Sequence, residues 1–424
     1  MPLDQQSRAR ILSAIEKLVL KRHINVAGVD YEAWRGLLRE RTPELLLASP
    51  DEFETGVQKL LMELGSSHAA FYHERPTHLQ PQHSINASLR SVTANGEDQW
   101  MFLDVFEGGP AGTARVKPGD FLLAVDGAPC VPPSMPTFQM GHKYTLTVSN
   151  VGGANRREIA VHIIGAKGTK DLPPMLEPKS IVHSVIPPNI GLLKIAWFGG
   201  GMGMQFADSL DAAIRDLKER GSDRLIIDLR GNIGGGLGFA RLASYLCSGR
   251  IPIGHTLTPQ RLRKGYNKDT LKRVPMPESR LGLLFALSRF AFRDKSIILL
   301  TQGLGPQTFH NRFAILVNEC TNSAAEMVAS FVAEHRLATV VGQKTPGRVL
   351  GAANFEVGSG YWLRLPVMGW YTPSGICLDG KGVLPDVEVD VDPYLLNEGV
   401  DQQLNKAIEI VTAGSTERKR VTQA

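Results

Sequence analysis

A serine at the junction of a buried strand and a helix is the residue with the most evident chemistry in this chain. Residues 315–326, ILVNECTNSAAE, begin as a continuous apolar strand, and helical periodicity resumes at 327–334. Ser323 lies at the junction between alanines and polar residues, where a hydroxyl can be exposed while helix N–H groups point at the same place. This pattern makes Ser323 a candidate nucleophile. The alternative is that Asn322 or Ser323 only caps the helix, with Glu326 completing a capping box.

A Gly-rich turn near the middle of the chain is the second candidate for chemistry. Residues 225–246, LIIDLRGNIGGGLGFARLASYL, predict a strand that delivers Asp228 and Arg230 at its carboxyl end, then a turn containing Gly234–Gly236, then a helix. Glycines let backbone N–H groups approach a ligand closely. The turn lacks the Lys-Ser/Thr pair of a P-loop and the spacing of a dinucleotide fingerprint, so nucleotide binding is the less favoured alternative. An oxyanion hole uses the same backbone donors.

The composition excludes several classes of protein. Of 424 residues, 43% are hydrophobic and 21% are charged, as in ordinary soluble globular proteins. The net charge of +5 is too dilute to predict a nucleic-acid surface, and no apolar run approaches the ~20 residues of a membrane span. The amphipathic start differs from a secretory signal, and the four cysteines are too widely separated to form a metal pair. We expect a cytoplasmic protein, with a periplasmic or exported form as the alternative if a leader was removed.

The chain divides into four regions with different patterns. Residues 1–81 show helical periodicity, and residues 82–166 alternate short strands with Gly- and Pro-bearing turns. Residues 167–413 alternate strands and helices, and residues 414–424 are a polar tail. The predicted fold class is therefore α/β, or α+β over several domains. In the third region we expect strands at 190–196, 225–229, 296–300, 314–317, 339–341, 355–366 and 383–391, and helices at 204–219, 238–247 and 324–334.

The second region resembles a PDZ domain. Its sequence GGPAGTARVKPGDFLLAVDGAPC places Pro110–Ala111 at the start of a short helix, then Lys117–Asp120, then a strand ending in Val125–Gly127. The resemblance implies that extended peptides, including C-terminal tails, bind by adding a strand to a sheet edge. The carboxylate-binding loop would fall on 85–88, INAS, which lacks the usual glycine.

A wider resemblance covers residues 50–395. The helical start, the PDZ-like region, DLRGNIGGG, NSAAE, VVGQKTPGR and YTPSGICLDGKGVLPDVEVD are similar, in this order, to the C-terminal-processing (tail-specific) serine peptidases and the related tricorn protease core. The resemblance implies a crotonase-like β/α core, polypeptide substrates, and no metal or organic cofactor. The sequence leaves the oligomeric state open, with a homo-oligomer as one possibility. The resemblance also implies that Ser323 is the nucleophile and that oxyanion donors come from Ala324 and from Gly234 or Gly235.

One position departs from the tail-specific pattern. That branch uses a Ser–Lys dyad, and here the turn after VVG carries Arg348 where the family has its lysine. Arginine stays protonated at any working pH and cannot act as a general base. Lys344 is nearby in sequence but precedes the turn, so it is the less favoured alternative base.

The resemblance to the tricorn-like branch supplies a different base. It places a Ser-His pair before the PDZ-like region and a carboxylate before GxxPD, which fall on Ser67, His68 and Asp379, with aspartate in place of the usual glutamate. Imidazole, with an ordinary pKa near ~6.5, can accept a hydroxyl proton at neutral pH. The alternatives are that His68 is a loop histidine and Asp379 a turn residue. The predicted function is a serine endopeptidase that forms an acyl-enzyme on Ser323, and the alternative is a catalytically inactive member that binds peptides or other ligands.

A run of basic residues remains outside this scheme. Six lysines and arginines crowd the stretch between 261 and 273 (Arg261, Arg263, Lys264, Lys268, Lys272 and Arg273). Such a run is usually a solvated face. The functional alternative is capture of acidic groups, or of the terminal carboxylate, of a peptide.

Overall fold

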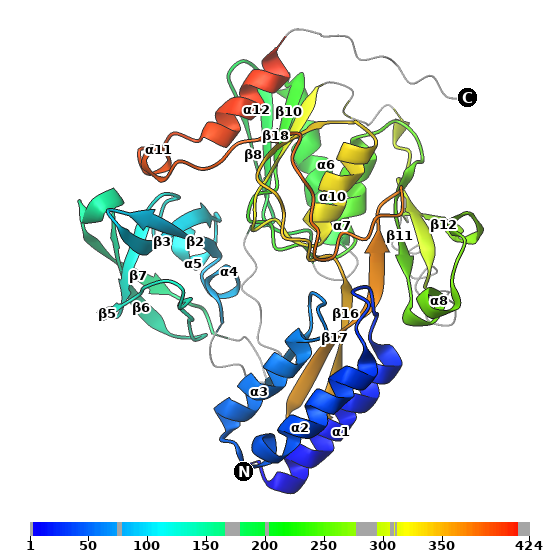
Figure 1. The fold of residues 1–424 in the computed structure, drawn as a ribbon. Coiled ribbons are helices and arrows are strands. Elements are labelled where there is room, and N and C mark those ends of the chain that lie inside the picture. The colour runs from blue at the N-terminus through cyan, green and yellow to red at the C-terminus, as the bar shows by residue number, and fades with distance from the viewer. Residues whose placement is uncertain are drawn as a thin grey trace.

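The computed structural model describes residues 3–73, 79–165, 179–199, 203–276, 295–305, 309 and 312–413. Figure 1 shows an N-terminal helical unit at the bottom, a β-rich unit at the left, and an α/β core that fills the top and right. The architecture is of the predicted α/β multidomain class.

The N-terminal unit consists of α1 (Gln5–Arg22), α2 (Tyr31–Leu47) and α3 (Pro50–Met62). Each helix begins after an oxygen-bearing N-cap, Asp4, Asp30 or Ser49, that accepts a backbone N–H of the first turn. The apolar faces of the helices join one core with side chains of β16 (Gly351–Gly358) and β17 (Tyr361–Tyr371). None of the helices that the structure describes is both long and apolar enough to cross a membrane.

The strand that follows these helices ties them to the rest of the molecule. β1 (Ala70–His73) pairs antiparallel with β17, and Ala70 lies opposite Arg364. β17 continues the sheet in the order β1-β17-β11-β13-β12, with β16 also paired to β17. The remaining strands of this sheet are β11 (Pro252–Leu257), β12 (Lys272–Pro275) and β13 (Ile297–Leu300), and α8 (Pro259–Lys264) follows β11. The segment just before β1, which includes His68, is therefore held beside the core.

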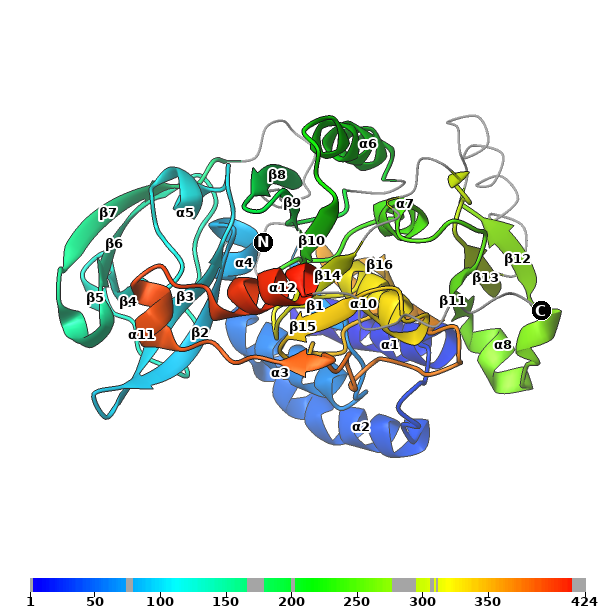
Figure 2. The same cartoon turned by 90° about the horizontal axis from the view of Figure 1, so that it is seen from above.

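The β-rich unit is a separate sheet in the order β2-β3-β4-β6-β7, with β5 paired to β4. Its elements are α4 (Pro81–Ser84), β2 (Ala87–Ala94), β3 (Glu97–Val105), α5 (Pro110–Thr113), β4 (Phe121–Val125), β5 (Ala128–Pro129), β6 (Lys143–Ser149) and β7 (Arg157–His162). Phe102, Leu122 and Leu146 are among the buried side chains of its own core. Figure 2 shows this unit beside α11 (Pro393–Asn397) and α12 (Gln402–Thr412) of the core.

The central sheet of the core has the order β18-β15-β14-β10-β9-β8. Its pairs are parallel except for β8 and β9. Alternation along the strands explains the layers: Ile227 and Ile315 pack in the core that holds α6, α7 and α10, whereas Ile226 and Leu316 pack with α12. The strands are β8 (Ile181–Ile186), β9 (Ile190–Ile195), β10 (Arg224–Asp228), β14 (Phe313–Val317), β15 (Thr339–Gly342) and β18 (Val387–Glu388), and the helices are α6 (Met204–Glu219), α7 (Gly238–Tyr245) and α10 (Ala324–Glu334).

Most predicted core elements are present, with two differences. The predicted strand at 355–366 is a hairpin of two strands, β16 and β17, because Ser359 and Gly360 turn the chain with positive φ angles. The prediction of a strand over 383–391 was wrong, since only Val387 and Glu388 pair with β15. The predicted polar tail at 414–424 lies outside the described residues.

Candidate active site

Ser323 lies where the loop after β14 meets the first residue of α10. β14 has parallel neighbours on both sides, so its carboxyl end lies at the middle of the sheet edge, where α/β proteins place their sites. Ser323 has φ 54° and ψ −114°, a conformation that residues with a Cβ rarely adopt. An ordinary cap is extended, as Ser49 is at φ −64° and ψ 165°. The strained turn favours a role for Ser323 beyond capping.

Glu326 holds the loop of Ser323 in place. Its fully buried carboxylate accepts the N–H of Ser323 at 3.0 Å, one half of the capping box considered from sequence. It also accepts the hydroxyl of Thr345 and the N–H groups of Gly347 and Arg348, at 2.6, 2.6 and 2.8 Å. Burial raises the pKa of Glu326, and these hydrogen bonds oppose the rise. Sequence reasoning missed this second role, which joins the nucleophile loop to residues 345–348.

The Gly-rich turn lies directly against Ser323. A Cβ at Gly234, which has φ 88°, would stand 2.7 Å from the Cβ of Ser323, so only glycine fits there. The N–H of Gly234 donates to Asn232 Oδ1 at 2.7 Å, and is thus already engaged. Within the described part of the chain, the N–H groups of Gly235 and Ala324 have no hydrogen-bond acceptor. Of the three predicted oxyanion donors, these two are the ones available to a ligand.

Ser67, His68 and Asp379 form a hydrogen-bonded chain on the other side of the site. Both the hydroxyl and the N–H of Ser67 donate to the Asp379 carboxylate, the N–H at 3.1 Å. Because the hydroxyl proton of Ser67 goes to Asp379, its oxygen is left to accept from His68 Nδ1 at 2.9 Å. The proton of a neutral imidazole then lies on Nδ1, and Nε2 is free to accept one. Aspartate in place of the family's usual glutamate reaches Ser67 directly.

The loop at 345–349 links the two sides. Glu326 holds its first part, and the N–H of Val349 donates to Asp379 at 3.4 Å. Among the described residues no hydrogen bond joins His68 to Ser323. Burial, with the positive charges of Arg364 and Arg348, lowers the pKa of His68 to about 4, so the imidazole is neutral at pH 7.

Comparison with known proteins agrees with this geometry. Residues 189–389, which contain Ser323, the Gly-rich turn and Asp379, match the family model of peptidase family S41. The core of this chain is therefore similar to the S41 peptidases.

Curated relatives extend the match beyond the core. It is 25% identical over 408 residues to the putative tricorn protease homolog 2 of Streptomyces coelicolor, which covers 91% of this chain and 30% of that protein. It is 24% identical to the carboxyl-terminal-processing protease of Synechocystis, over 94% of this chain and 87% of that one, and 24% identical to the carboxy-terminal processing protease CtpA of Bacillus subtilis, over 73% and 58%. The chain thus spans from less than a third to most of the length of these relatives.

Solved structures show the same fold. The photosystem II D1 C-terminal processing protease has a TM-score of 0.55 at 17% identity and covers 96% of this chain and 97% of its own. An S41 protease structure from Bacteroides fragilis has a TM-score of 0.57 at 18% identity and covers 93% and 96%. These structures confirm the predicted α/β fold.

Two basic residues that follow β15 lie on the surface of the core. Arg348, at the family's lysine position, and Lys344 are exposed. Within the described residues, neither side chain forms a hydrogen bond to Ser323. Lys344 therefore has no contact among the described residues that would make it a base, whereas His68 is oriented by Ser67, which Asp379 holds in turn.

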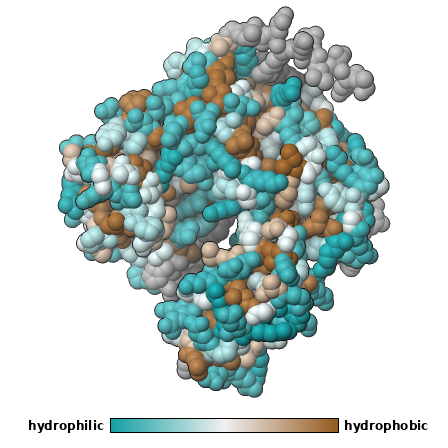
Figure 3. All heavy atoms as spheres, viewed as in Figure 1, coloured by the Kyte–Doolittle hydropathy of each residue, from teal (hydrophilic) through white to brown (hydrophobic). Residues whose placement is uncertain are grey.

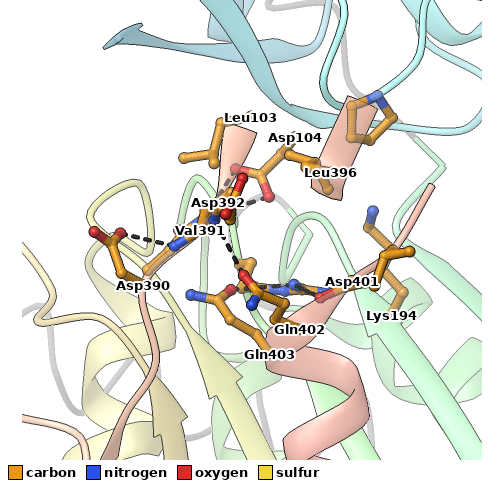
Figure 4. A pocket seen from close by; sticks show the side chains of 14 residues that line it. Leu103, Asp104, Lys194, Asp390, Val391, Asp392, Leu396, Asp401, Gln402 and Gln403 are labelled. Atoms are coloured by element: carbon orange, nitrogen blue, oxygen red, sulfur yellow. Dashed lines mark hydrogen bonds and ion pairs between the residues drawn. The ribbon is translucent and has the colours of Figure 1, made fainter. Parts of the chain in front are cut away.

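Behind the nucleophile loop, the β-rich unit contacts the core through a buried carboxylate. Asp104 accepts the hydroxyl of Ser88 at 2.5 Å and the side-chain amide of Asn318 at 3.0 Å. Asn318 Oδ1 accepts the N–H groups of Gly231 and Cys320 at 2.9 and 3.1 Å, so one amide touches the Gly-rich turn, the nucleophile loop and the β-rich unit. Figure 4 shows Asp104 on one side of a small pocket between the two units.

Asp228 and Arg230, the charged residues predicted at the end of β10, have a structural role. Arg230 binds Asp228 at 2.8 Å and Asp401, the N-cap of α12, at 2.8 Å. Both neighbours keep the pKa of Arg230 well above its usual value. These two residues anchor α12 to the sheet and make no contact with Ser323 in the described structure. No group of three or more metal-ligating side chains occurs within the described ranges.

Proposed function

We propose that this chain is a serine endopeptidase of the tail-specific type, which hydrolyses peptide bonds of unfolded polypeptides through an acyl-enzyme on Ser323. The hydrogen-bonded chain from Asp379 through Ser67 to His68 carries the proposal, because it leaves Nε2 as a proton acceptor. The matches to S41 peptidases support the same reaction class.

In the proposed reaction, His68 Nε2 takes the proton of Ser323 while Oγ attacks the carbonyl carbon of the scissile bond. The N–H groups of Gly235 and Ala324 receive the oxyanion of the tetrahedral intermediate. The imidazolium then protonates the leaving amine, and the C–N bond breaks to give the acyl-enzyme. Water, deprotonated by His68, releases the new carboxyl terminus and restores Ser323. Nε2 and Oγ must come within hydrogen-bond distance during turnover.

A fluorophosphonate probe tests the nucleophile. We expect one covalent adduct on Ser323, found by mass spectrometry of tryptic peptides, and no adduct on the Ser323→Ala variant. Equal labelling of both proteins would contradict the proposal. Turnover of an unfolded model protein, followed by the appearance of new amino termini, provides the independent measurement.

We further propose that the chain belongs to the branch with a histidine base, as in the tricorn core, and that its β-rich unit is a PDZ-like peptide-binding domain. Arg348, the Ser67–His68 pair and the match to the Streptomyces tricorn homologue support the branch. The edge strands β2 and β7 provide the backbone groups that strand addition requires. Peptides with a free C-terminal carboxylate should bind more tightly than their amidated forms; equal affinities would contradict tail recognition.

A second candidate is a catalytically inactive peptide-binding member of the family. Two observations favour it: His68 and Ser323 are not hydrogen-bonded to each other, and the lowered pKa of His68 makes it a weak base. Turnover that is present in the natural sequence and absent from a His68→Ala variant would eliminate this candidate. Peptide binding without turnover at any pH would favour it.

A further inference from the structure

A basic groove lies between the end of α1, the helix α8 and the hairpin of β16 and β17. Its cations come from three parts of the chain that are far apart in sequence. Lys21 and Arg22 end α1, Lys295 precedes β13, and α8 supplies three more. The lining residues are Lys21, Arg22, Thr258, Pro259, Gln260, Arg261, Arg263, Lys264, Lys295, Ala353, Phe355 and Val367. Figure 3 shows hydrophilic surface at the lower right, over α8.

The described lining residues carry charge of one sign. Six of them are lysine or arginine, and none of the described lining residues is an acid. Among the described residues, no ion pair involves Lys21, Arg22, Arg263, Lys264 or Lys295, and all five are exposed. Six cations, with no carboxylate among the described lining residues, give a positive potential that attracts anions.

The groove also has an apolar part. Ala353 and Phe355 of β16 and Val367 of β17 line it and are partly exposed. The volume is about 990 Å³, which holds several side chains of an extended polypeptide. A ligand that matches both features has carboxylates for the cations and apolar side chains for the apolar part.

The groove adjoins the elements that carry the catalytic side chains. Arg22 is followed by His23, whose Nε2 is hydrogen-bonded to the hydroxyl of Ser66 at 2.9 Å, directly before Ser67 and His68. The strand of Ala353 and Phe355 begins at Gly351, two residues after Val349, whose N–H donates to Asp379. The groove is therefore connected to the base side of the site from two directions.

We propose that this groove is an exosite for an acidic, partly apolar segment of the polypeptide substrate, which it holds while a more distant peptide bond occupies the site at Ser323. This rests on the proposed peptidase function for its role in turnover. The binding itself does not depend on catalysis and is tested separately.

The binding test uses the Ser323→Ala variant and two fluorescent peptides. One alternates Glu with Leu and Phe, and the other carries Gln at every Glu position. We expect the acidic peptide to bind at least about tenfold more tightly at low salt, and this preference to shrink at high salt. Equal affinities would overturn the exosite even if the enzyme is active. Tighter binding of single-stranded RNA than of the acidic peptide would also overturn it.

The location test reverses two exposed charges of the groove, Arg263→Glu with Lys264→Glu. A matched control reverses two exposed cations elsewhere, Arg156→Glu with Arg215→Glu, and changes the net charge equally. The groove variant should lose acidic-peptide affinity by about tenfold and the control by less than about twofold. In the active protein, the groove variant should have a higher KM for an acidic substrate and an unchanged kcat. Its KM and kcat for a neutral substrate should be unchanged. Equal losses in both variants would show a general charge effect and overturn the site.

Discussion

The two sides of the candidate active site are built in different ways. On the nucleophile side, Ser323 and the Gly-rich turn are fixed by buried groups of the core: Glu326, Asn232 and Asn318 are 0–1% exposed and bind backbone N–H groups at 2.6–3.1 Å. On the base side, His68 depends on two partly buried side chains, Ser67 and Asp379. His68 comes from the N-terminal unit and Asp379 from the end of the core.

One side of the site is therefore rigid, and the other is assembled from segments that are distant in sequence. Ser323 and the N–H groups of Gly235 and Ala324 belong to one sheet edge, and the β-rich unit packs behind them through the hydrogen bond between Asp104 and Asn318. The position of His68 depends on the pairing of β1 with β17 and on the loop at 345–349, which binds Asp379. Changes on the nucleophile side should therefore cost stability, and changes on the base side should cost activity alone.

Loss of either catalytic side chain should have the largest effect. Ser323→Ala and His68→Ala should each lower kcat by about 10⁴-fold or more, and the double variant should be no worse, since the two act as one unit. Stopped assays on an unfolded substrate measure the loss. If the His68→Ala variant has the same kcat as the natural sequence, His68 is not the general base. The contrast between the nucleophile side and the base side would then be wrong as well.

Asp379→Asn should lower kcat by about 10²–10⁴-fold with little loss of stability. The amide has one acceptor oxygen for the two donors of Ser67, so the hydrogen bond that keeps the proton on His68 Nδ1 is weakened. Asp379→Glu, which restores a carboxylate, is the control and should retain more activity. A thermal melt of each variant separates loss of stability from loss of activity. A large drop in Tm for Asp379→Asn would contradict the expectation that changes on the base side affect activity alone.

Glu326→Gln should destabilise the fold by about 2–3 kcal/mol, because an NH₂ group would face N–H donors that now point at a carboxylate oxygen. Urea unfolding measures the change. Glu219→Gln, at the exposed end of α6, is the matched control and should be neutral. Equal stabilities of the two variants would show that the nucleophile side is less rigid than its hydrogen bonds indicate.

The acid limb of kcat/KM should respond to Arg348. The positive charges of Arg364 and Arg348 contribute to the lowered pKa of His68, about 4, because they disfavour the imidazolium. Activity that needs neutral His68 is therefore retained at pH 7 and lost as the pH falls through that pKa. Arg348→Gln removes a positive charge, so the pKa should rise and the acid limb should move to higher pH, by less than ~1 unit for a screened surface charge. Arg215→Gln should leave the limb in place.

Lys344→Ala should have the smallest effect, a change in kcat of less than about twofold, because the side chain is exposed. If this variant lost activity while His68→Ala retained it, the base would be the lysine and the histidine chain would be structural. The same assay and substrate serve for both variants.

Local patterns in the sequence were sufficient for much of the fold. Apolar runs with period 2 or 3.6 predicted α6 and α10 at their observed bounds and most strands of the central sheet within one or two residues. The strand at 383–391 was mispredicted because its alternating pattern satisfies a β-strand locally, whereas only two of its residues find a partner strand.

Only part of the candidate site could be predicted from local patterns, because such patterns do not reveal partners that are distant in sequence. Ser323 and the Gly-rich turn have local signals, a strand followed by small residues and a helix. Ser67, His68 and Asp379 have none, and only the resemblance to a family singled them out. The roles of Glu326 and Asn318 were missed because their partners are backbone N–H groups of other loops, which side-chain patterns do not reveal.

The sequence by itself determined the residue types available for catalysis: a serine at a strand–helix junction, glycines beside it, and an arginine that cannot act as a base where a lysine is expected. The tertiary structure decided which groups meet. It directed the Ser67 hydroxyl toward Asp379 and so set the tautomer of His68, and it engaged the N–H of Gly234 and left that of Gly235 available. Hydrogen bonds between residues 312 positions apart depend on how the chain closes on itself, and no local pattern contains that information.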